Sequence, residues 1–109
     1  MRVVFTPRAI RQLEHLHDYL SEKASDRIAD DYVGRILAHC QKLTLFPQRG
    51  TLRDHVLPGL RTIGFERRAT IAFMVEADRV VIEGVFHGGQ DFEQALRGDD
   101  PEFPSPEDR

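Results

Sequence analysis

The sequence lacks the features that mark secreted and membrane proteins. Among its 109 residues there is one cysteine, Cys40, and no tryptophan. A single cysteine excludes an internal disulfide framework, which favours a reducing compartment. The first residues contain no apolar segment of signal-peptide length, and no run approaches the roughly 18 apolar residues that span a bilayer. We therefore expect a cytoplasmic protein that is not inserted in a membrane.

Motifs for metals, cofactors and covalent catalysis are also missing. His15 and His17 are two residues apart, so on a helix they point in different directions, and no CxxC or HxxxH spacing occurs. Gly88 and Gly89 lack the further glycines of a phosphate-binding loop, and no serine lies in a GxSxG motif. Cys40 falls on an apolar helix stripe, which indicates a buried structural thiol. We expect no metal and no cofactor.

Length and charge distribution indicate one domain with a distinct tail. A chain of 109 residues has room for a single domain. The net charge of -3 combines a nearly neutral body with residues 99–109, which hold five acidic residues, one arginine and three prolines. Such a composition cannot bury enough apolar surface to offset the entropy of ordering. We expect a domain over residues 1–98 and a disordered, acidic, proline-rich tail over residues 99–109.

The first half of the chain has the pattern of a strand followed by a helical hairpin. Arg2–Phe5 is a short β-branched and aromatic run. Thr6 and Pro7 suit the N-cap and first position of a helix. Ser25 suits the cap of a second helix, which we expect to end at Phe46–Pro47 and to lie antiparallel to the first. The apolar stripes are Ala9, Leu13, Leu16 and Leu20, then Ala29, Tyr32, Val33, Ile36, Cys40 and Leu43.

The second half of the chain has the period of a sheet. Ile71, Phe73 and Val75 share one strand face, which suits a sheet covered on one side by helices. Ala77–Asp78 leaves only a tight hairpin turn between two strands. We expect a loop over Gln48–Gly59, strands over Leu60–Phe65, Thr70–Glu76 and Arg79–Phe86, and a short helical turn over Phe92–Leu96. The predicted fold is α+β, of order β-α-α-β-β-β, with the helical hairpin packed on one face of a small, mainly antiparallel sheet of about four strands.

Arginine is concentrated in one part of the domain. Residues 49–68 hold five arginines against two acidic residues, Asp54 and Glu66. Such a patch attracts phosphate or an acidic partner, although a solvated arginine-rich surface has the same composition. The candidates for binding a partner are Arg49, Arg53, Arg61, Arg67 and Arg68.

His87 stands at the end of the last expected strand. In a four-stranded sheet, it could converge with Arg61, Arg67 and Arg68 on one exposed surface. A histidine among arginines offers an acid–base group and cations for developing charge, which is the minimum for cleaving a phosphodiester through its 2′-hydroxyl. These four residues are the catalytic candidates if the protein is a ribonuclease. Alternatively, His87 anchors the Gly88–Gly89 turn by a hydrogen bond.

Residues spread from about Val3 to Leu96 carry a family resemblance. They are Ala9, Leu13, Leu16 and Tyr19, then Tyr32, Ile36 and Cys40, then Leu43-x-x-Phe46-Pro47-x-x-Gly50, Pro58-Gly59-Leu60-Arg61, and Val85-x-His87-Gly88 with Asp91. In this order they resemble the RelE/ParE superfamily of bacterial toxins from type II toxin–antitoxin pairs, and more closely its ParE branch. The resemblance implies the β-α-α-β-β-β fold, a tightly bound cognate antitoxin, and growth arrest when the toxin is free.

The two branches of this superfamily imply different targets. ParE-like members are associated with poisoning DNA gyrase, and RelE-like members with cutting mRNA on the ribosome. The ribonuclease branch usually places basic residues and a late tyrosine, or a histidine–tyrosine pair, on its sheet. Here Tyr19 and Tyr32 both belong to the helical stripes, which argues against a ribonuclease. ParE-like members often have an arginine immediately before this aspartate, whereas Gln90 precedes Asp91 here. We therefore assign no role that depends on that arginine.

Three hypotheses follow from the resemblance. The first is a binding protein rather than an enzyme: a toxin that contacts gyrase, is silenced by a ParD-like or other small DNA-binding antitoxin, and does not itself bind DNA. The second is a ribosome-dependent mRNA endonuclease that uses His87 with Arg61, Arg67 and Arg68. The third is a degenerate toxin retained only as an antitoxin-binding partner. Under the first hypothesis, the five arginines favour an acidic segment of the antitoxin or target.

Overall fold

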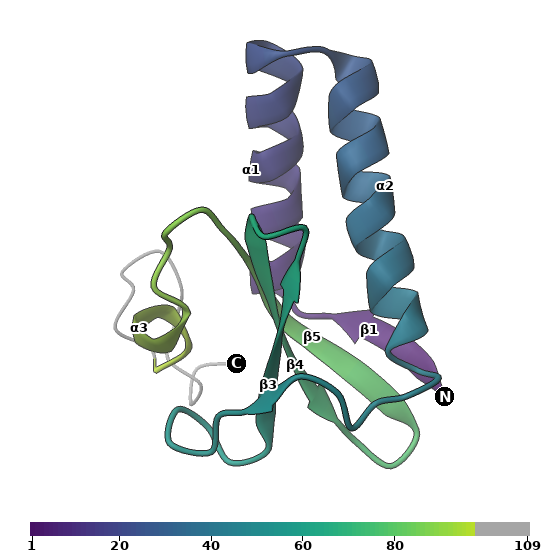
Figure 1. The fold of residues 1–109 in the computed structure, drawn as a ribbon, viewed down its shortest axis with the longest axis vertical. Helices are drawn as coiled ribbons and strands as arrows, with labels where there is room; N and C mark the ends of the chain where they lie inside the picture. The colour runs from purple at the N-terminus through teal and green to yellow at the C-terminus, as the bar shows by residue number, and fades with distance from the viewer. Residues whose placement is uncertain (98–109) are drawn as a thin grey trace.

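The computed structural model describes residues 1–97, which form a helical hairpin, a five-stranded sheet and a short third helix (Figure 1). The tail expected over residues 99–109 lies outside the described residues. The helices are α1 (Pro7–Lys23), α2 (Asp26–Lys42) and α3 (Phe92–Leu96). The strands are β1 (Arg2–Phe5), β2 (Thr51–Leu52), β3 (Leu60–Phe65), β4 (Ala69–Val75) and β5 (Arg79–His87).

The sheet has the strand order β1-β5-β4-β3-β2. β1 runs parallel to β5, with Val4 opposite Val81, and the remaining pairs are antiparallel. The β4–β5 hairpin closes at the expected place, since the Glu76 N–H donates to the Arg79 carbonyl at 2.8 Å. The α+β class, the β-α-α-β-β-β order and the mainly antiparallel sheet are therefore confirmed.

β2 lies in the segment that was predicted to be loop, so the sheet has five strands rather than about four. Thr51 and Leu52 pair with Thr62 and Arg61 of β3. Just before them, Gly50 has a φ of 75°, and a Cβ there would lie 2.2 Å from the Thr62 carbonyl oxygen. Only glycine fits this close approach. A strand of two residues has no period of its own, so pairing with β3 alone defines it.

Both predicted helix caps are present. Thr6 Oγ1 accepts the Ala9 N–H at 3.2 Å, and Ser25 Oγ accepts the Ile28 N–H at 3.1 Å. Each bond satisfies a backbone donor that has no partner within the helix. These contacts fix where α1 and α2 begin.

The second helix ends earlier than predicted, at Lys42 rather than at Phe46–Pro47. The Leu43 N–H donates to the Cys40 carbonyl at 3.1 Å, so the chain tightens into a 3₁₀-type turn. Leu43 nevertheless stays in the core, with none of its surface exposed. The apolar stripe continues past the end of the helix, and for this reason periodicity overestimates the length of α2.

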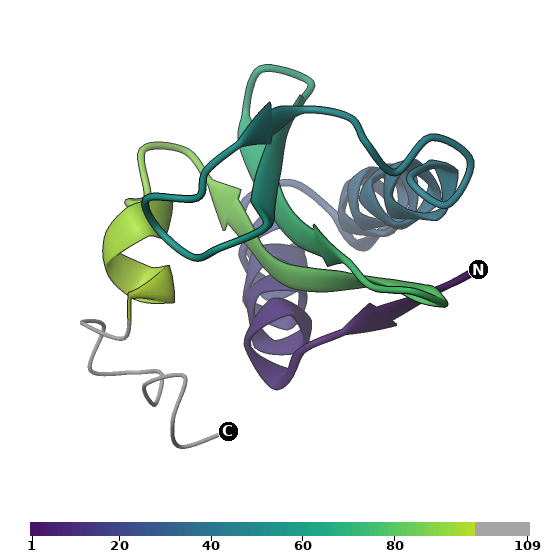
Figure 2. The same ribbon diagram turned by 90° about the horizontal axis from the view of Figure 1, so that it is seen from below.

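The sheet has an apolar core on each face. The core between the sheet and the hairpin contains Leu13, Leu16, Tyr32, Ile36, Cys40, Leu43, Phe65, Ile71, Phe73, Ile82 and Val85, with Val75 partly buried beside them. The smaller core on the other face contains Val56, Leu60, Ala72, Phe86, Ala95 and Leu96. Figure 2 shows α2 and α3 on opposite sides of the sheet. The hairpin therefore covers one face, as predicted, and α3 with the segment before β3 covers part of the other.

Tyr19 does not belong to the buried stripe. Its exposed fraction is 55%, whereas that of Tyr32 is 7%. In Figure 1 the tip of the hairpin extends beyond the sheet, so a residue near that tip has no sheet to pack against.

Within residues 1–97, no helix has the length and apolar character required to cross a membrane.

Candidate functional site

The four catalytic candidates do not form one surface, because they lie near opposite ends of β3. Arg61 lies opposite Phe73 of β4, whereas His87 lies opposite Ala69. Phe73 and Ala69 are four positions apart on β4, which is roughly 14 Å along an antiparallel strand. The expected convergence of Arg61 with His87 and the two later arginines is therefore wrong. Arg61 stands near the start of β3, and the other three candidates lie at the opposite end of this extended strand.

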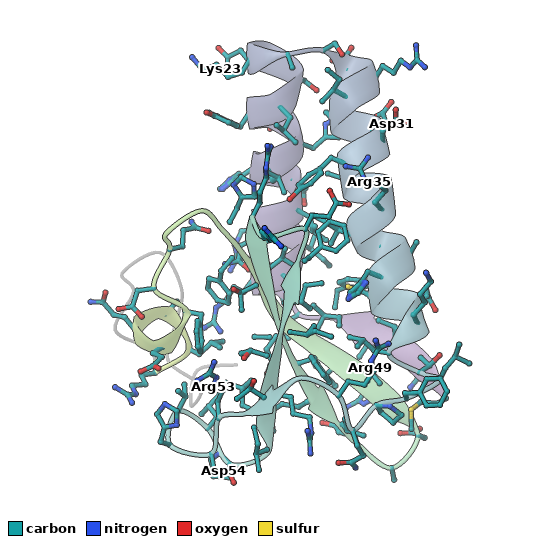
Figure 3. All side chains as sticks on the ribbon, viewed as in Figure 1. Lys23, Asp31, Arg35, Arg49, Arg53 and Asp54 are labelled. Carbon is teal, nitrogen blue, oxygen red and sulfur yellow. The ribbon has the colours of Figure 1, made fainter. Side chains whose placement is uncertain are left out.

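Arg61 instead forms hydrogen bonds to the segment that precedes the edge strand β2. Its guanidinium donates to the Gln48 side-chain oxygen at 2.8 Å and to the Arg49 carbonyl at 3.3 Å. Figure 3 shows Arg49 beside the lower part of the sheet, well below Arg35 of α2. Three apolar side chains beside this segment are exposed: Leu45 (70%), Phe46 (68%) and Leu52 (47%). We call Leu45, Phe46, Arg49, Leu52 and Arg61 the β2-edge surface.

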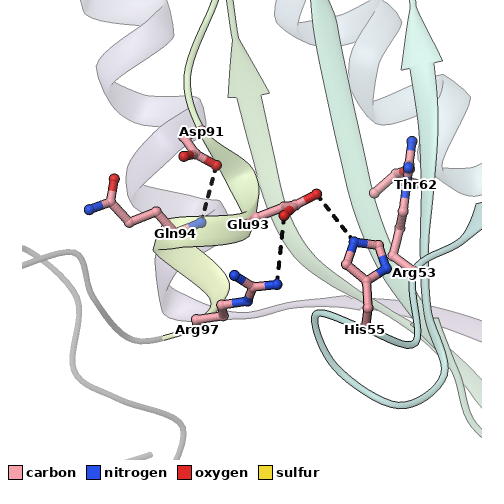
Figure 4. A network of polar contacts seen from close by, with 7 residues as sticks. All are labelled: Arg53, His55, Thr62, Asp91, Glu93, Gln94 and Arg97. Carbon is pink, nitrogen blue, oxygen red and sulfur yellow. Dashed lines mark hydrogen bonds and ion pairs between the residues drawn. The ribbon is translucent and has the colours of Figure 1, made fainter.

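Arg53 has a third location and a structural contact of its own. Its guanidinium donates to Thr62 Oγ1 at 3.1 Å and lies 5.7 Å from the Phe92 ring centre, so it connects β3 with α3. Beside it, His55 approaches Glu93 of α3 at 3.3 Å, and Glu93 also approaches Arg97 at 3.7 Å (Figure 4). This network docks α3 on the sheet. Arg53 is thus engaged within the fold.

The remaining candidates line a cleft between the hairpin and the β3–β4 turn. The cleft has a volume of about 670 Å³ and is open to solvent on one side. It is lined by Tyr19, Leu20, Ile28, Asp31, Tyr32, Arg35, Glu66, Arg68 and His87. We call it the hairpin cleft. A second hollow of about 440 Å³ adjoins it, shares Arg68 and His87, and adds Arg67.

Aromatic contacts hold His87 in the hairpin cleft. Its ring meets the ring of Tyr32 edge-on, with centres 6.0 Å apart, and Tyr32 also packs edge-on against Phe65 at 5.8 Å. Burial raises the pKa of the Tyr32 hydroxyl. That hydroxyl is buried and has no hydrogen-bond partner among residues 1–97. The sheet histidine is therefore paired with a tyrosine, but the tyrosine comes from α2.

An ion pair fixes the wall of the hairpin cleft that faces the helices. Arg35 of α2 donates two hydrogen bonds to the Glu66 carboxylate, at 2.8 and 3.1 Å. This contact lowers the pKa of the Glu66 carboxyl and raises that of the Arg35 guanidinium. The guanidinium also lies 5.3 Å from the Tyr32 ring centre. The pair connects α2 to the β3–β4 turn.

That turn has a strained backbone. Glu66 and Arg67 have φ values of 49° and 60°, and the Arg68 N–H donates to the Phe65 carbonyl at 3.0 Å. Two-residue hairpin turns with positive φ at both positions favour Asn-Gly, because other side chains raise the energy of this conformation. Strain of this kind persists where neighbouring contacts hold it. Here the Arg35–Glu66 pair is such a contact.

The imidazole of His87 does not anchor the glycine turn. The backbone does so instead: the His87 N–H donates to the Gln90 side-chain oxygen, and the Gly88 N–H donates to the Arg68 carbonyl, both at 2.8 Å. Within residues 1–97, the ring of His87 forms no hydrogen bond and contacts Tyr32. His87 thus does anchor the turn by a hydrogen bond, but through its backbone N–H, and its ring faces the cleft.

Sequence reasoning missed Tyr19, Arg35 and Glu66 as members of a site. The only local signal was that Tyr19 lies beside the apolar stripe of α1 rather than on it. Arg35 and Glu66 are 31 residues apart, so no spacing rule connects them. The candidates Arg67, Arg68 and His87, in contrast, were correctly expected to lie near one another.

The described residues offer neither a metal site nor a reactive thiol. Among residues 1–97 there is no group of three or more histidine, cysteine, aspartate or glutamate side chains that could hold a metal ion. Cys40 is fully buried, and burial raises the pKa of its thiol to about 12. At neutral pH the thiol is therefore protonated and a poor nucleophile.

A protein family and a solved structure that match this chain agree with each other. The family described as "ParE toxin of type II toxin-antitoxin system, parDE" matches residues 3–92. Among solved structures, one described as "Chromosomal ParDE TA system from P. aeruginosa" is similar in fold, with a TM-score of 0.70 and 22% sequence identity. That match covers 81% of this chain and 96% of the other. No curated protein sequence matches this chain.

Proposed function

The chain belongs to the family of ParE toxins of type II toxin–antitoxin systems, and we propose that it stops growth by poisoning DNA gyrase in the cytoplasm unless a cognate antitoxin neutralises it. In this proposal it acts by protein–protein contact and is not an enzyme. It needs no cofactor, and it does not bind DNA alone.

The charge pattern of the hairpin cleft is the observation that carries this proposal. Asp31 and Glu66 line the same cleft as Arg35 and Arg68, so the formal charges of these four side chains balance. A phosphodiester entering there would meet these two carboxylates, which oppose the attraction of the arginines. Arg61, which would have added positive charge, lies at the far end of β3. The cleft is therefore better suited to a protein surface than to an RNA strand.

The β2-edge surface supports the antitoxin part of the proposal. β2 is an edge strand of the sheet, and edge strands present unpaired backbone groups that accept an added strand. Leu52 within β2, and Leu45 and Phe46 a few residues before it in the chain, expose apolar side chains. Arg49 adds positive charge that favours an acidic segment. An amphipathic antitoxin segment with acidic residues would satisfy all three features.

The contact between Tyr32 and His87 favours a second candidate function, a ribosome-dependent mRNA endonuclease. These rings lie against each other, and Arg67 and Arg68 stand beside them. A histidine–tyrosine pair among arginines has the groups needed for acid–base cleavage of RNA. However, the Tyr32 hydroxyl is buried, so it is poorly placed to exchange a proton with a substrate. We therefore rank this candidate second.

Induced expression in bacteria separates the two functions. We expect replication to stop and DNA-damage signalling to begin, while mRNA stays intact at first. The matched variant is His87→Ala, which removes the only histidine of the cleft. If early mRNA cleavage occurs and His87→Ala abolishes it, the protein is an endonuclease. If the protein binds its antitoxin but neither effect follows induction, it is a degenerate toxin retained as a partner.

A further inference from the structure

The hairpin cleft and the β2-edge surface are separate regions of the molecule. Arg61 of the β2-edge surface and His87 of the cleft lie at opposite ends of the strands that connect them. The two lining sets share no residue. A partner segment bound at the β2 edge therefore leaves a second exposed surface that the antitoxin contact described above does not use.

The hairpin side of the cleft exposes apolar groups that the fold does not use. Tyr19 and Ile28 have exposed fractions of 55% and 51%, and neither side chain is part of the buried core. Both line the cleft, next to Tyr32 and Arg35. Tyrosine and arginine are the residue types that contribute most to binding at protein interfaces, especially in a pocket. The cleft thus has the composition of an interface centre.

The polar groups of the cleft define the charge that a ligand should carry. Arg35 and Glu66 neutralise each other through their double hydrogen bond. Arg68 forms no ion pair within residues 1–97, although its charge helps to lower the pKa of the Glu66 carboxyl. Arg68 is exposed and lines the cleft, so one carboxylate of a ligand fits beside it. Asp31 balances this remaining positive charge, so the lining has no net formal charge to attract a long polyanion.

Contacts between distant parts of the chain also connect the wall of the cleft. Arg35 ties α2 to the strained β3–β4 turn, and the rings of Tyr32, Phe65 and His87 pack edge to edge beneath it. A preformed wall lowers the entropy lost when a ligand binds. The Arg35–Glu66 pair holds the turn in the left-handed backbone conformation at Glu66 and Arg67, which sets the shape of this wall.

From these features we infer that the hairpin cleft binds the target protein, through a target segment that carries an aromatic or branched apolar side chain beside a carboxylate. The apolar side chain packs on Tyr19 and Ile28, and the carboxylate meets Arg68. This inference rests on the proposed function, in which the toxin acts by protein contact. It adds that the surfaces for target and antitoxin are different.

The test uses the full chain with two variants of the cleft, Arg68→Glu and Tyr19→Ala, and one control, Lys23→Glu. Arg68 and Tyr19 are exposed, so both variants should fold, and a thermal melt verifies this. Lys23 is exposed near the hairpin tip and does not line the cleft, so it gives the same charge reversal nearby (Figure 3). Each protein is induced to measure growth inhibition, and each is copurified with the product of the neighbouring gene to measure antitoxin binding.

We expect both cleft variants to need roughly thirtyfold more toxin for the same growth inhibition, the loss typical of an interface hot spot. Antitoxin binding should be unchanged in both, and Lys23→Glu should behave as the wild type. Full toxicity of Arg68→Glu would overturn the inference. Loss of antitoxin binding in the cleft variants would overturn it as well, because the cleft would then hold the antitoxin. If the wild type is harmless and captures no neighbour, the proposed function itself fails.

Discussion

At the scale of single residues, the β3–β4 turn is the clearest departure from local preference. Arg67 has a φ of 60° and an exposed side chain, and it forms no ion pair within residues 1–97. A glycine would relieve roughly 1–2 kcal/mol of steric cost, offset by about 0.5–1 kcal/mol of extra backbone entropy in the unfolded chain. We expect Arg67→Gly to stabilise the fold by about 0.5–1 kcal/mol, seen as a rise of several degrees in Tm.

The control for this substitution is Arg67→Ala, which removes the same side chain but keeps a Cβ at positive φ. It should give no such gain in a thermal melt. An equal rise in Tm for alanine and glycine would mean that charge, not backbone strain, limits stability at this turn. Arg35 of α2 holds Glu66 by an ion pair. The strained conformation of this turn therefore depends on a contact across the hairpin cleft as well as on the pairing of β3 with β4.

At the scale of elements, the edge strand β2 and its flanking residues carry the antitoxin proposal. Arg49 is exposed, and Figure 3 places it at the opposite end of the molecule from Lys23. We expect Arg49→Glu to weaken the complex with the antitoxin by about tenfold, mainly through slower association at low salt. Lys23→Glu makes the same charge change far from β2 and should leave the association rate nearly unchanged. Surface plasmon resonance at two salt concentrations measures both, and an unaltered association rate for Arg49→Glu would remove Arg49 from the interface.

At the scale of the whole molecule, the fold has two edges and a sheet with a partly covered second face. A partner present at 1,000 times its Kd adds roughly 4 kcal/mol of apparent stability, which is a large share of the 5–15 kcal/mol typical of a domain. We therefore expect the toxin to express poorly alone and to copurify with the product of the neighbouring gene. Coexpression with a tag on one subunit, followed by size-exclusion chromatography, measures this. An abundant, harmless monomer that captures nothing from its neighbour would contradict the toxin–antitoxin assignment.

Local signals in the sequence were sufficient for most of the fold. Thr6 and Ser25 cap the helices as their side chains predict, because a cap needs only neighbours within one turn. The period of the apolar residues distinguishes the helical hairpin from the strands, since each period matches one backbone geometry. The same signals miss β2 and place the end of α2 too late. The conformation at Gly50 depends on its close approach to Thr62, and Leu43 is buried in the core although it lies beyond the helix.

The sequence by itself therefore determined the elements, their order and the family resemblance, whereas the tertiary structure decided which side chains form a site. Arg61, Arg68 and His87 look equivalent along the chain, but the length of β3 carries Arg61 away from the other two. Tyr19, Arg35 and Glu66 enter the cleft only because α1, α2 and the β3–β4 turn meet in space. Such contacts join residues far apart in sequence, and their geometry depends on the packing of whole elements, which no local pattern encodes.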